Sequence, residues 1–329
     1  MDIAQWRLVV GAAELAPSVH NTQPWRFVVR GEEALEVRAD WDRQLQSLDR
    51  SGRQLRISCG AAVEYARLSL RAMGRDVRVD VLPVEDDPDL LALLTPAGER
   101  GAEPSELELV DAMARRHTDR GTYEPADLSD AQMDEWRNGV AGFGVWAHFV
   151  VSADDRVVVA ATLSDAEQRQ AADPSYVTEI SRWTHRQQRE DGVVGTPPAW
   201  PADRVSDMPL RDFSGRAEHP HPDSGEPPIV ERDALLVLGT ERDDPAAQIA
   251  AGRALAWLLL RITVDGLSGQ PLGQALDDID SRLRLAHDLR VVGHPQFLLR
   301  IGRGHSAAQS GRRGIATEVA AGPAPVVES

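Results

Sequence analysis

The sequence predicts an α+β fold made of two related halves, residues 1–104 and residues 105–329. Amphipathic helical patterns are interspersed with short apolar or alternating stretches that are typical of strands. One strand–helix–strand pattern occurs twice along the chain. With 329 residues, of which 42% are hydrophobic, the chain is also long and apolar enough to bury a substantial core.

The repeated unit is a strand, a helix that follows one glycine and is closed by another, and a second strand. Gly60 and Gly74 bound the helix of the first half, and Gly252 and Gly266 bound the helix of the second half at the same spacing. A glycine at a helix end adopts the left-handed conformation at little cost. The repeated segments are residues 25–29, 60–73 and 77–82 in the first half, and residues 145–151, 252–265 and 296–302 in the second.

The first half begins with a helix over residues 2–16, whose apolar residues fall on or near one face, and Pro17 ends it. A hairpin of two strands follows, and then an apolar helix and an alternating strand. An acidic, proline-containing stretch leads into a helix for which Ser105 and Glu108 form a capping box. These later segments are residues 25–30, 34–39, 60–73, 75–82, 83–104 and 105–115.

The second half is predicted to contain a strand, a mostly helical stretch, a short buried strand, a long apolar helix and a last strand. Their residues are 145–151, 153–189, 235–239, 246–265 and 296–302. An insertion over residues 190–228 interrupts this pattern, because it is proline-rich, shows little periodicity and is too long for an ordinary connection.

Two interpretations of this insertion stay open. It is either a flexible loop or a lid over a site. Its apolar residues favour partial packing, because they give the segment something to bury; they are Trp200, Met208, Leu210 and Phe213.

The charge composition excludes some partners. The formal net charge is -16, which disfavours general binding to nucleic acid or to an anionic membrane. The chain has no lysine, so every fixed cationic side chain is an arginine, the residue best suited to grip a phosphate with paired donors. No nucleic-acid or membrane partner is therefore expected.

The compartment is predicted to be the cytoplasm. The only cysteine, Cys59, lies in an apolar helix and is expected to be a buried hydrophobic residue rather than a nucleophile. The N-terminus shows no basic region before an apolar run. The most apolar helical stretch, residues 254–263, is too short to span a bilayer and is flanked by Arg253 and interrupted by Arg261.

Residues 16–25 read APSVHNTQPW and form the most specific segment. They place one hydroxyl and two amides in a polar loop between a helix and a strand. Such groups suit the edge of a planar heterocycle that has both donors and acceptors. The alternative is a turn that is simply well hydrogen-bonded.

Residues 115–123 read RRHTDRGTY and form a local basic cluster in an acidic protein. Three guanidinium groups that lie close together repel one another unless an anion offsets their charge. The alternative is a solvated helix end whose arginines pair with Glu108, Asp111 or Asp119. Arg312 and Arg313 form a further candidate phosphate grip near the C-terminus.

These segments resemble the nitroreductase family. Residues 16–25 are similar to its Pro-Ser-x-x-Asn-x-Gln-Pro-Trp loop, and residues 115–123 are similar to its Arg-Arg-Ser-x-Arg-x-Tyr phosphate segment, with Thr118 in place of the serine. Ordinary members are homodimers that hold FMN with residues of both subunits. Here each half carries one of the two segments, which resembles the fused, dimer-like Acg subfamily with one FMN and a covering lid. Further matches are residues 57–62, 236–240, 252–255, 266–268, 271–272 and 295–302.

The resemblance implies a nitroreductase-like fold of two fused pseudo-repeats, each with a mainly antiparallel sheet packed by helices. It also implies an FMN site. The residues implied at the isoalloxazine edge and the ribityl chain are Ser18, Asn21 and Gln23. Those implied at the phosphate and ribityl end are Arg115, Arg116, Thr118 and Arg120, with Arg312 or Arg313 opposite. Those implied beside the redox-active flavin nitrogen are Gln270, Pro271 and Leu272.

The implied function is an FMN-dependent oxidoreductase that takes hydride from NAD(P)H as a transient reductant and passes electrons to a nitroaromatic, a quinone or a similar small acceptor. Because the flavin carries the chemistry, no catalytic side chain is expected. The sequence shows no metal-ligand spacing and no Gly-x-Gly-x-x-Gly loop after a strand. A fused pair completes its own site, so a monomer is expected.

Two other functions stay open. In the first, the protein sequesters FMN and the lid denies substrates access to the ring. In the second, the chain is a structural module that binds no flavin. Reduction of the bound flavin by NADPH separates the enzyme from the sequestering protein.

Overall fold

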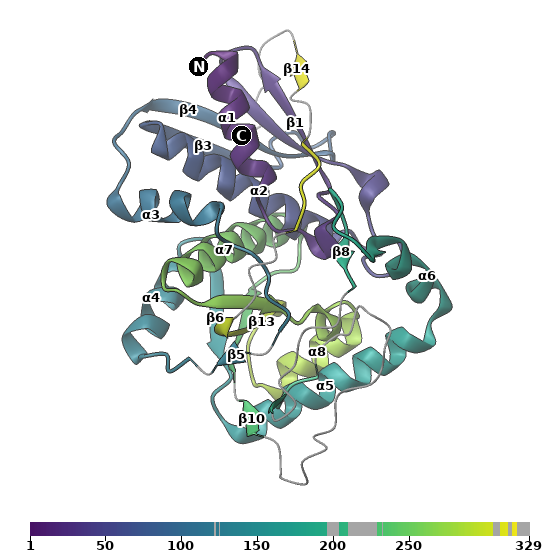
Figure 1. Cartoon of the computed structure of the whole chain (residues 1–329). Coiled ribbons are helices and arrows are strands. Elements are labelled where there is room, and N and C mark those ends of the chain that lie inside the picture. Colours follow the sequence, from purple (N-terminus) through teal and green to yellow (C-terminus); the bar gives the residue numbers. More distant parts are fainter. Residues whose placement is uncertain are drawn as a thin grey trace. The chain divides into compact units, whose positions relative to one another are not determined.

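The computed structural model of the chain is shown in Figure 1. It describes residues 1–121, 123–124, 126–195, 204–209, 229–231, 233–304, 310–314 and 318–320. The chain divides into two compact units, and each is discontinuous in sequence. Unit 1 comprises Met1–Arg116, Asp244–Val264 and Gly311–Ser329, and unit 2 comprises His117–Asp243 and Asp265–Ser310.

Unit 1 is built on a five-stranded sheet with the strand order β14-β1-β2-β4-β3. Neighbouring strands run antiparallel except for β14, which lies parallel to β1. The strands are β1 (Trp25–Arg30), β2 (Ala34–Ala39), β3 (Arg75–Val81), β4 (Leu90–Glu99) and β14 (Glu318–Ala320).

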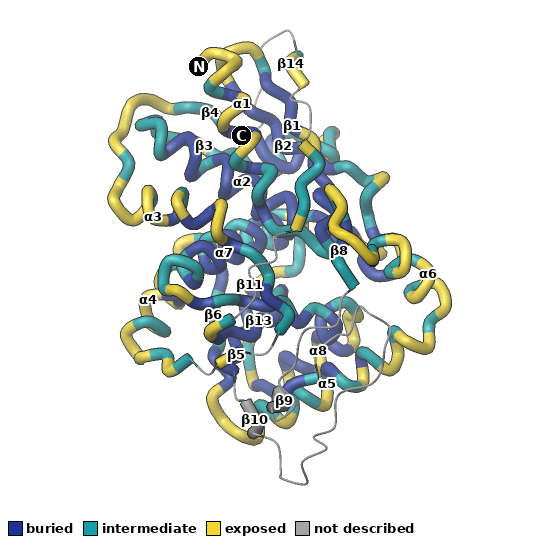
Figure 2. Tube along the Cα trace, in the orientation of Figure 1, coloured by how far each residue is buried: buried dark blue, intermediate teal, exposed yellow. Residues whose placement is uncertain are grey.

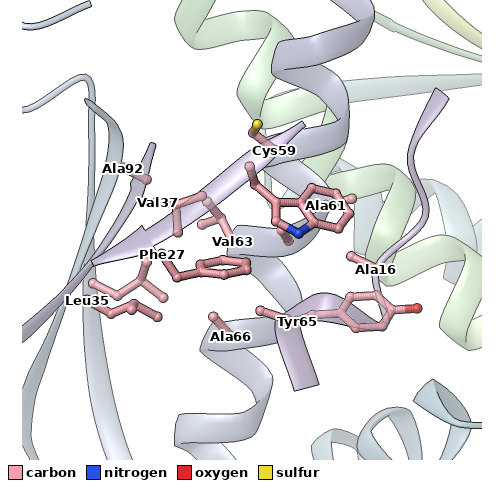
Figure 3. Close-up of a cluster of buried hydrophobic side chains, with 14 of the residues drawn as sticks. Ala16, Phe27, Leu35, Val37, Cys59, Ala61, Val63, Tyr65, Ala66 and Ala92 are labelled. Carbon is pink, nitrogen blue, oxygen red and sulfur yellow. The ribbon is translucent and has the colours of Figure 1, made fainter. Parts of the chain in front are cut away.

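The helices of unit 1 pack around α2, which is buried along nearly its whole length and dark blue for most of it in Figure 2. They are α1 (Ile3–Glu14), α2 (Arg53–Ala72), α3 (Pro104–Met113) and α7 (Pro245–Val264), with short 3-10 turns η1 (Val19–Asn21) and η2 (Trp41–Arg43). In Figure 3, Phe27 and Leu35 of the sheet lie against Val63 and Ala66 of α2. This contact is part of the unit 1 core.

Unit 2 is built on an antiparallel sheet with the order β12-β13-β11-β6, and β5 also pairs with β13. Helices α5 and α8 and the turn η3 pack on it around a second apolar core that includes Val159, Leu163 and Leu285. Its larger strands are β5 (Tyr123–Glu124), β6 (Val145–Phe149), β11 (Ala234–Thr240), β12 (Ser268–Pro271) and β13 (His294–Gly304). Its helices are α4 (Asp130–Ala141), α5 (Ala153–Ala172), α6 (Pro174–Trp183), η3 (Gly273–Leu276) and α8 (Ile279–Asp288).

Two short parallel strand pairs also belong to unit 2. They are β7 (Thr184–His185) with β8 (Val193–Val194), and β9 (Arg204–Ser206) with β10 (Ile229–Glu231). Strands β8 and β9 lie within the predicted insertion, and each pairs with a strand outside it.

The observed sheets and helices confirm the α+β class and the mainly antiparallel pairing. The two compact units do not coincide with residues 1–104 and 105–329, because α7 and the C-terminal residues pack in unit 1. That the two halves are related pseudo-repeats stays a prediction.

Several predicted boundaries were wrong. The central helix α2 begins at Arg53, because Asp49 accepts hydrogen bonds from the Gln54 and Leu55 amides and so caps an earlier start. The helix predicted over residues 105–115 begins at Pro104, a residue favoured at the first helical position. Its capping contact joins the Glu103 amide to Glu106, rather than Ser105 to Glu108.

Other elements were missed. Strand β4 lies in the stretch that was predicted to be an acidic connection. It was missed because acidic residues and prolines flank its apolar start. Helices α4 and α8 and strands β12 and β14 were not predicted. The helical stretch over residues 153–189 ends at Trp183 and is broken at Asp173, whose side chain caps α6.

Parts of the predicted insertion over residues 190–228 are described, whereas Trp200, Leu210 and Phe213 lie outside the described residues. Asp207 forms an ion pair with Arg156 of α5 at 2.6 Å, and Met208 is buried in the core of unit 2. These two residues are therefore packed on unit 2. That the insertion is a lid stays a prediction.

One described helix, α7, is long and apolar enough by composition to cross a membrane. The sequence predicted this helix over residues 246–265, but only its most apolar stretch, residues 254–263, was compared with the length of a membrane span. The full helix runs over 20 residues. Of the most apolar window of this helix, 61% is buried inside the structure. This burial is typical of a core helix.

Candidate functional site

The polar loop after α1 forms a strained turn, here called the amide turn (residues 18–23). His20, Asn21 and Gln23 all adopt left-handed backbone conformations, with φ of 44°, 54° and 49°. Residues other than glycine rarely adopt this conformation, and it persists only where the surroundings hold it. Three such residues within four positions mark the turn as a functional candidate.

Hydroxyl groups hold the amide turn in place. Ser18 Oγ accepts a hydrogen bond from the Gln23 amide at 2.9 Å, which closes the turn on itself. Ser58 Oγ of α2 accepts one from the Val19 amide at 3.1 Å and donates to the Gln54 carbonyl oxygen. Ser18 therefore shapes the turn in this structure, and its predicted contact with a flavin stays a prediction.

The side chains of the amide turn bind the arginine segment (residues 311–313). Asn21 Nδ2 donates to the Gly311 carbonyl oxygen at 3.1 Å, and Arg312 Nη1 donates to Asn21 Oδ1 at 3.3 Å. The Arg313 amide donates to Gln23 Oε1 at 3.0 Å. Residues that lie about 290 positions apart in the sequence thus form one structure within unit 1.

Arg312 links the amide turn to the predicted phosphate segment. It donates from Nη2 to the carbonyl oxygen of Leu15, just after α1. Its charge is close enough to Arg116 and Tyr65 to interact with both. Burial and the Arg116 charge lower the pKa of Arg312 to about 10, while Tyr65 opposes this shift. Arg116, Arg312 and Tyr65 are here called the anion cluster.

The anion cluster has unsatisfied donors. Arg116 is 8% exposed and Tyr65 is fully buried. Among the described residues, Arg116 Nε and the Tyr65 hydroxyl lack a hydrogen-bond partner of acceptable geometry. Burial raises the pKa of Tyr65, and Arg116, through its charge and as a donor close to the hydroxyl, opposes this rise together with the charge of Arg312. Figure 3 shows the Tyr65 hydroxyl pointing away from the Phe27 side of the core.

Within the described ranges, no carboxylate lies at ion-pair distance from Arg116. Glu108, one of the three counter-ions that the sequence offered, pairs instead with Arg261 of α7 at 3.4 Å. Two like charges are therefore held close together and largely out of water, an arrangement that a bound anion would stabilise.

The remaining residues of the predicted phosphate segment differ in their surroundings. Arg115 is exposed. Thr118 and Arg120 are half-buried and belong to unit 2. Burial raises the pKa of Tyr123, and the charge of Arg120 is one of the charges that oppose this rise. The Tyr123 hydroxyl donates to the Asp119 carbonyl oxygen at 2.8 Å.

Arg300 stabilises this part of unit 2. Its side chain is fully buried, pairs with Asp233 at 3.2 Å and lies 4.0 Å from the centre of the Tyr123 ring. It also donates to the Gly121 carbonyl oxygen. The loop that carries Arg120 is thus held by the hydrogen bond from Arg300, which is itself paired with Asp233.

The segment predicted beside the flavin nitrogen lies in unit 2. Gln270 of β12 lies opposite Arg300 of β13 in the strand register. The Leu272 amide donates to the Leu298 carbonyl oxygen at 2.9 Å. Gln270 and Leu272 are buried, and Pro271 is half-buried. Gln270 Oε1 and Gln274 Nε2 have no hydrogen-bond partner in the described part of the chain.

Two polar residues of this geometry were not predicted from the sequence. Tyr65 lies on an apolar helix, where an aromatic residue reads as core, so the sequence held no signal for it. Gln274 lies four residues after Gln270. A polar residue in a buried turn indicates a functional site, but the sequence did not predict this turn. Cys59 is fully buried, as expected, and burial raises the pKa of its thiol. No group of metal-ligating residues occurs in the described chain.

Comparison with known proteins gives similar sequences over most of the chain. A Mycobacterium tuberculosis protein named as an NAD(P)H nitroreductase is 33% identical over 308 residues, which cover 92% of this chain and 86% of that protein. The M. tuberculosis protein named as NAD(P)H nitroreductase Acg is 29% identical and covers 87% and 85% of the two chains. The Serratia protein named as NAD(P)H nitroreductase PigM is 26% identical and covers 89% and 87%.

No family model matches the sequence. Among solved structures, one named as a nitroreductase from Anabaena variabilis is similar, with a TM-score of 0.41 and 12% sequence identity. The similarity covers 83% of this chain and 69% of that chain.

Proposed function

Because the chain belongs to the NAD(P)H nitroreductase family, we propose that it binds one FMN and passes electrons from NAD(P)H to a small nitroaromatic, quinone or similar acceptor. When bound, the flavin supplies the hydride and electron chemistry. The protein's own residues hold the phosphate, orient the ring and control which molecules reach it.

The anion cluster carries this proposal. Arg116 and Arg312 present two guanidinium groups, and Tyr65 presents a buried hydroxyl with no hydrogen-bond partner of acceptable geometry among the described residues. A phosphate monoester offers three acceptor oxygens and close to two negative charges near neutral pH. All three side chains would donate to such a group, and its negative charge would offset the repulsion between the two guanidinium groups. The donor set therefore fits the phosphate of FMN.

The strained amide turn gives further support. The left-handed conformations of His20, Asn21 and Gln23 oppose folding, and hydrogen bonds to Ser18 and to the arginine segment hold them. In enzymes such strain is concentrated at ligand sites. The turn adjoins the anion cluster through Arg312.

For unit 2, the proposal keeps the assignments that the family resemblance implies. Thr118 and Arg120 follow Arg116 directly in the chain and are assigned to the phosphate and ribityl end. Gln270, Pro271 and Leu272 are assigned to the flavin ring. The buried Gln270 Oε1, an acceptor with no hydrogen-bond partner among the residues that the structure describes, supports this assignment, because a planar heterocycle with N–H groups can donate to it.

The test is the visible spectrum of the purified protein, followed by anaerobic mixing with NADPH. One FMN per chain and bleaching of the flavin band support the proposal. One FMN per chain without bleaching by NADPH or NADH favours a sequestering protein. A protein that neither contains FMN nor binds added FMN overturns the proposal.

A further inference from the structure

We propose that the amide turn is the dock for the arginine segment, and that Gln23 is the positioning residue that holds this segment in place. Gln23 then acts through Arg313 rather than by touching the flavin ring. The inference rests on the proposed function in one respect, because the docked segment carries Arg312 of the anion cluster. The docking itself concerns only residues of unit 1.

The environment of Gln23 supports this role. The residue is completely buried. Its Oε1 accepts from the Arg313 amide at 3.0 Å, and its Nε2 donates to the Asn21 carbonyl oxygen at 3.2 Å. Its own carbonyl oxygen accepts from Arg313 Nη2 at 3.1 Å. Both polar ends of the side chain are thus used by the protein itself.

Asn21 fixes the neighbouring residues of the segment. Its Nδ2 binds the Gly311 carbonyl oxygen, and its Oδ1 accepts from Arg312 Nη1. A second anchor joins Arg312 Nη2 to the Leu15 carbonyl oxygen at 2.9 Å. These contacts hold the Arg312 guanidinium where the charge of Arg116 acts on it.

Docking has an electrostatic penalty that an anion removes. Bringing Arg312 beside Arg116 places two like charges together in a partly desolvated region. The hydrogen bonds that join Asn21 and Gln23 to the arginine segment offset this repulsion in the absence of an anion. A bound phosphate favours the docked segment, and by reciprocity the docked segment favours the phosphate by the same factor.

The experiment measures hydrogen exchange of the peptide that contains residues 310–314, in the apoprotein and with added FMN. Gln23→Met keeps the side-chain volume and removes both hydrogen bonds. Gln23→Glu keeps an acceptor for the Arg313 amide and serves as the rescue variant. Gln46→Met, an exposed change in the same unit, is the matched control. Arg313→Ala provides a second variant, which changes no residue of the amide turn itself.

We expect Gln23→Met to speed exchange of this peptide in the apoprotein at least tenfold and to weaken FMN binding about tenfold. Gln23→Glu should restore part of both, and Gln46→Met should change neither. At saturating FMN, the absorption bands of the flavin in Gln23→Met should match those of the wild type. Arg313→Ala should speed the same exchange, because it removes the bonds to the Gln23 and Trp25 carbonyl oxygens.

Unchanged exchange in both Gln23→Met and Arg313→Ala overturns the inference. A shifted flavin spectrum in Gln23→Met with unchanged exchange shows direct contact with the ring and also overturns it. The apoprotein arm needs no cofactor. Absence of FMN binding in the wild type would therefore reject the proposed function while the docking result still stands.

Discussion

Gly60 of α2 and Gly252 of α7 meet where the two helices cross. A Cβ atom on Gly60 would overlap the Ile249 carbonyl oxygen, and a Cβ atom on Gly252 would overlap the Ile57 carbonyl oxygen. The contact is reciprocal, because each overlapped carbonyl lies three residues before the opposing glycine. The two helices are therefore closer than any side chain at either position would permit.

Alanine at either glycine should destabilise unit 1. The added methyl group meets backbone rather than a flexible side chain, so the helices must separate. We expect Gly60→Ala and Gly252→Ala each to lower the free energy of unfolding by about 1–3 kcal/mol, measured by chemical denaturation. Gly11→Ala is the matched control. Gly11 is exposed within α1 with open space around its Cβ position, so alanine there should stabilise by about 0.5–1 kcal/mol. Wild-type stability in both crossing variants would contradict the close approach.

Replacing Arg116 should separate stability from binding. Arg116→Met removes the like charge beside Arg312 but also removes a donor to the phosphate. We expect the Kd for FMN to rise at least about 30-fold, measured by fluorescence titration, because a partly buried charge pair is lost. The thermal midpoint of the apoprotein should stay equal or rise, since the repulsion is relieved.

The control for Arg116→Met is Arg7→Met, which removes an exposed arginine of α1 and should alter neither quantity. A large loss of apoprotein stability in Arg116→Met would indicate a structural ion pair instead.

Tyr65→Phe tests the third donor of the anion cluster. The change keeps the ring in the core and removes only the hydroxyl, which has no hydrogen-bond partner of acceptable geometry in the described structure. We expect the Kd for FMN to rise about tenfold to a hundredfold, the range for loss of a hydrogen bond to a charged group. The apoprotein should unfold at the same or a higher temperature. An unchanged Kd would remove Tyr65 from the site.

Inorganic phosphate should bind the anion cluster without the rest of the cofactor. Millimolar phosphate is expected to raise the thermal midpoint of the wild-type apoprotein more than chloride of equal ionic strength does. The difference should vanish in Arg116→Met, because the site then loses a guanidinium. An equal response to both salts would argue against a phosphate site.

Glu106 should make the stability of unit 1 sensitive to acid. Burial favours a higher pKa, but hydrogen bonds from Arg71 and the Glu103 amide, with the charge of Arg67, lower the pKa of Glu106 to about 2. Because the folded pKa is depressed, the stabilisation is present above the unfolded pKa of about 4.3 and is lost as pH falls toward 2.

Denaturation at pH 6, 4 and 3 should show a steeper loss of stability in the wild type than in Glu106→Gln. The control, Glu99→Gln, changes an exposed carboxylate and should keep the wild-type slope. Identical slopes in all three proteins would contradict the role of Glu106.

The sequence by itself determined the class of the fold and the family. Periodicity located most of the long helices, and the two motifs at residues 16–25 and 115–123 carried the resemblance. It could not locate β4, because flanking acidic residues and prolines obscured its short apolar run. It also could not decide which unit α7 belongs to, because a buried apolar helix carries no signal for its partner.

Tertiary structure alone decided the arrangement of the candidate site. Hydrogen bonds between the amide turn and the arginine segment, donated by Asn21 and accepted by Gln23, join residues separated by nearly the whole chain, and no local pattern encodes such a pairing. The same is true of Tyr65, whose hydroxyl becomes notable only when packing excludes water and leaves it beside two guanidinium groups. Local propensity fixes the elements, whereas the chemistry of a buried site depends on which groups folding brings together.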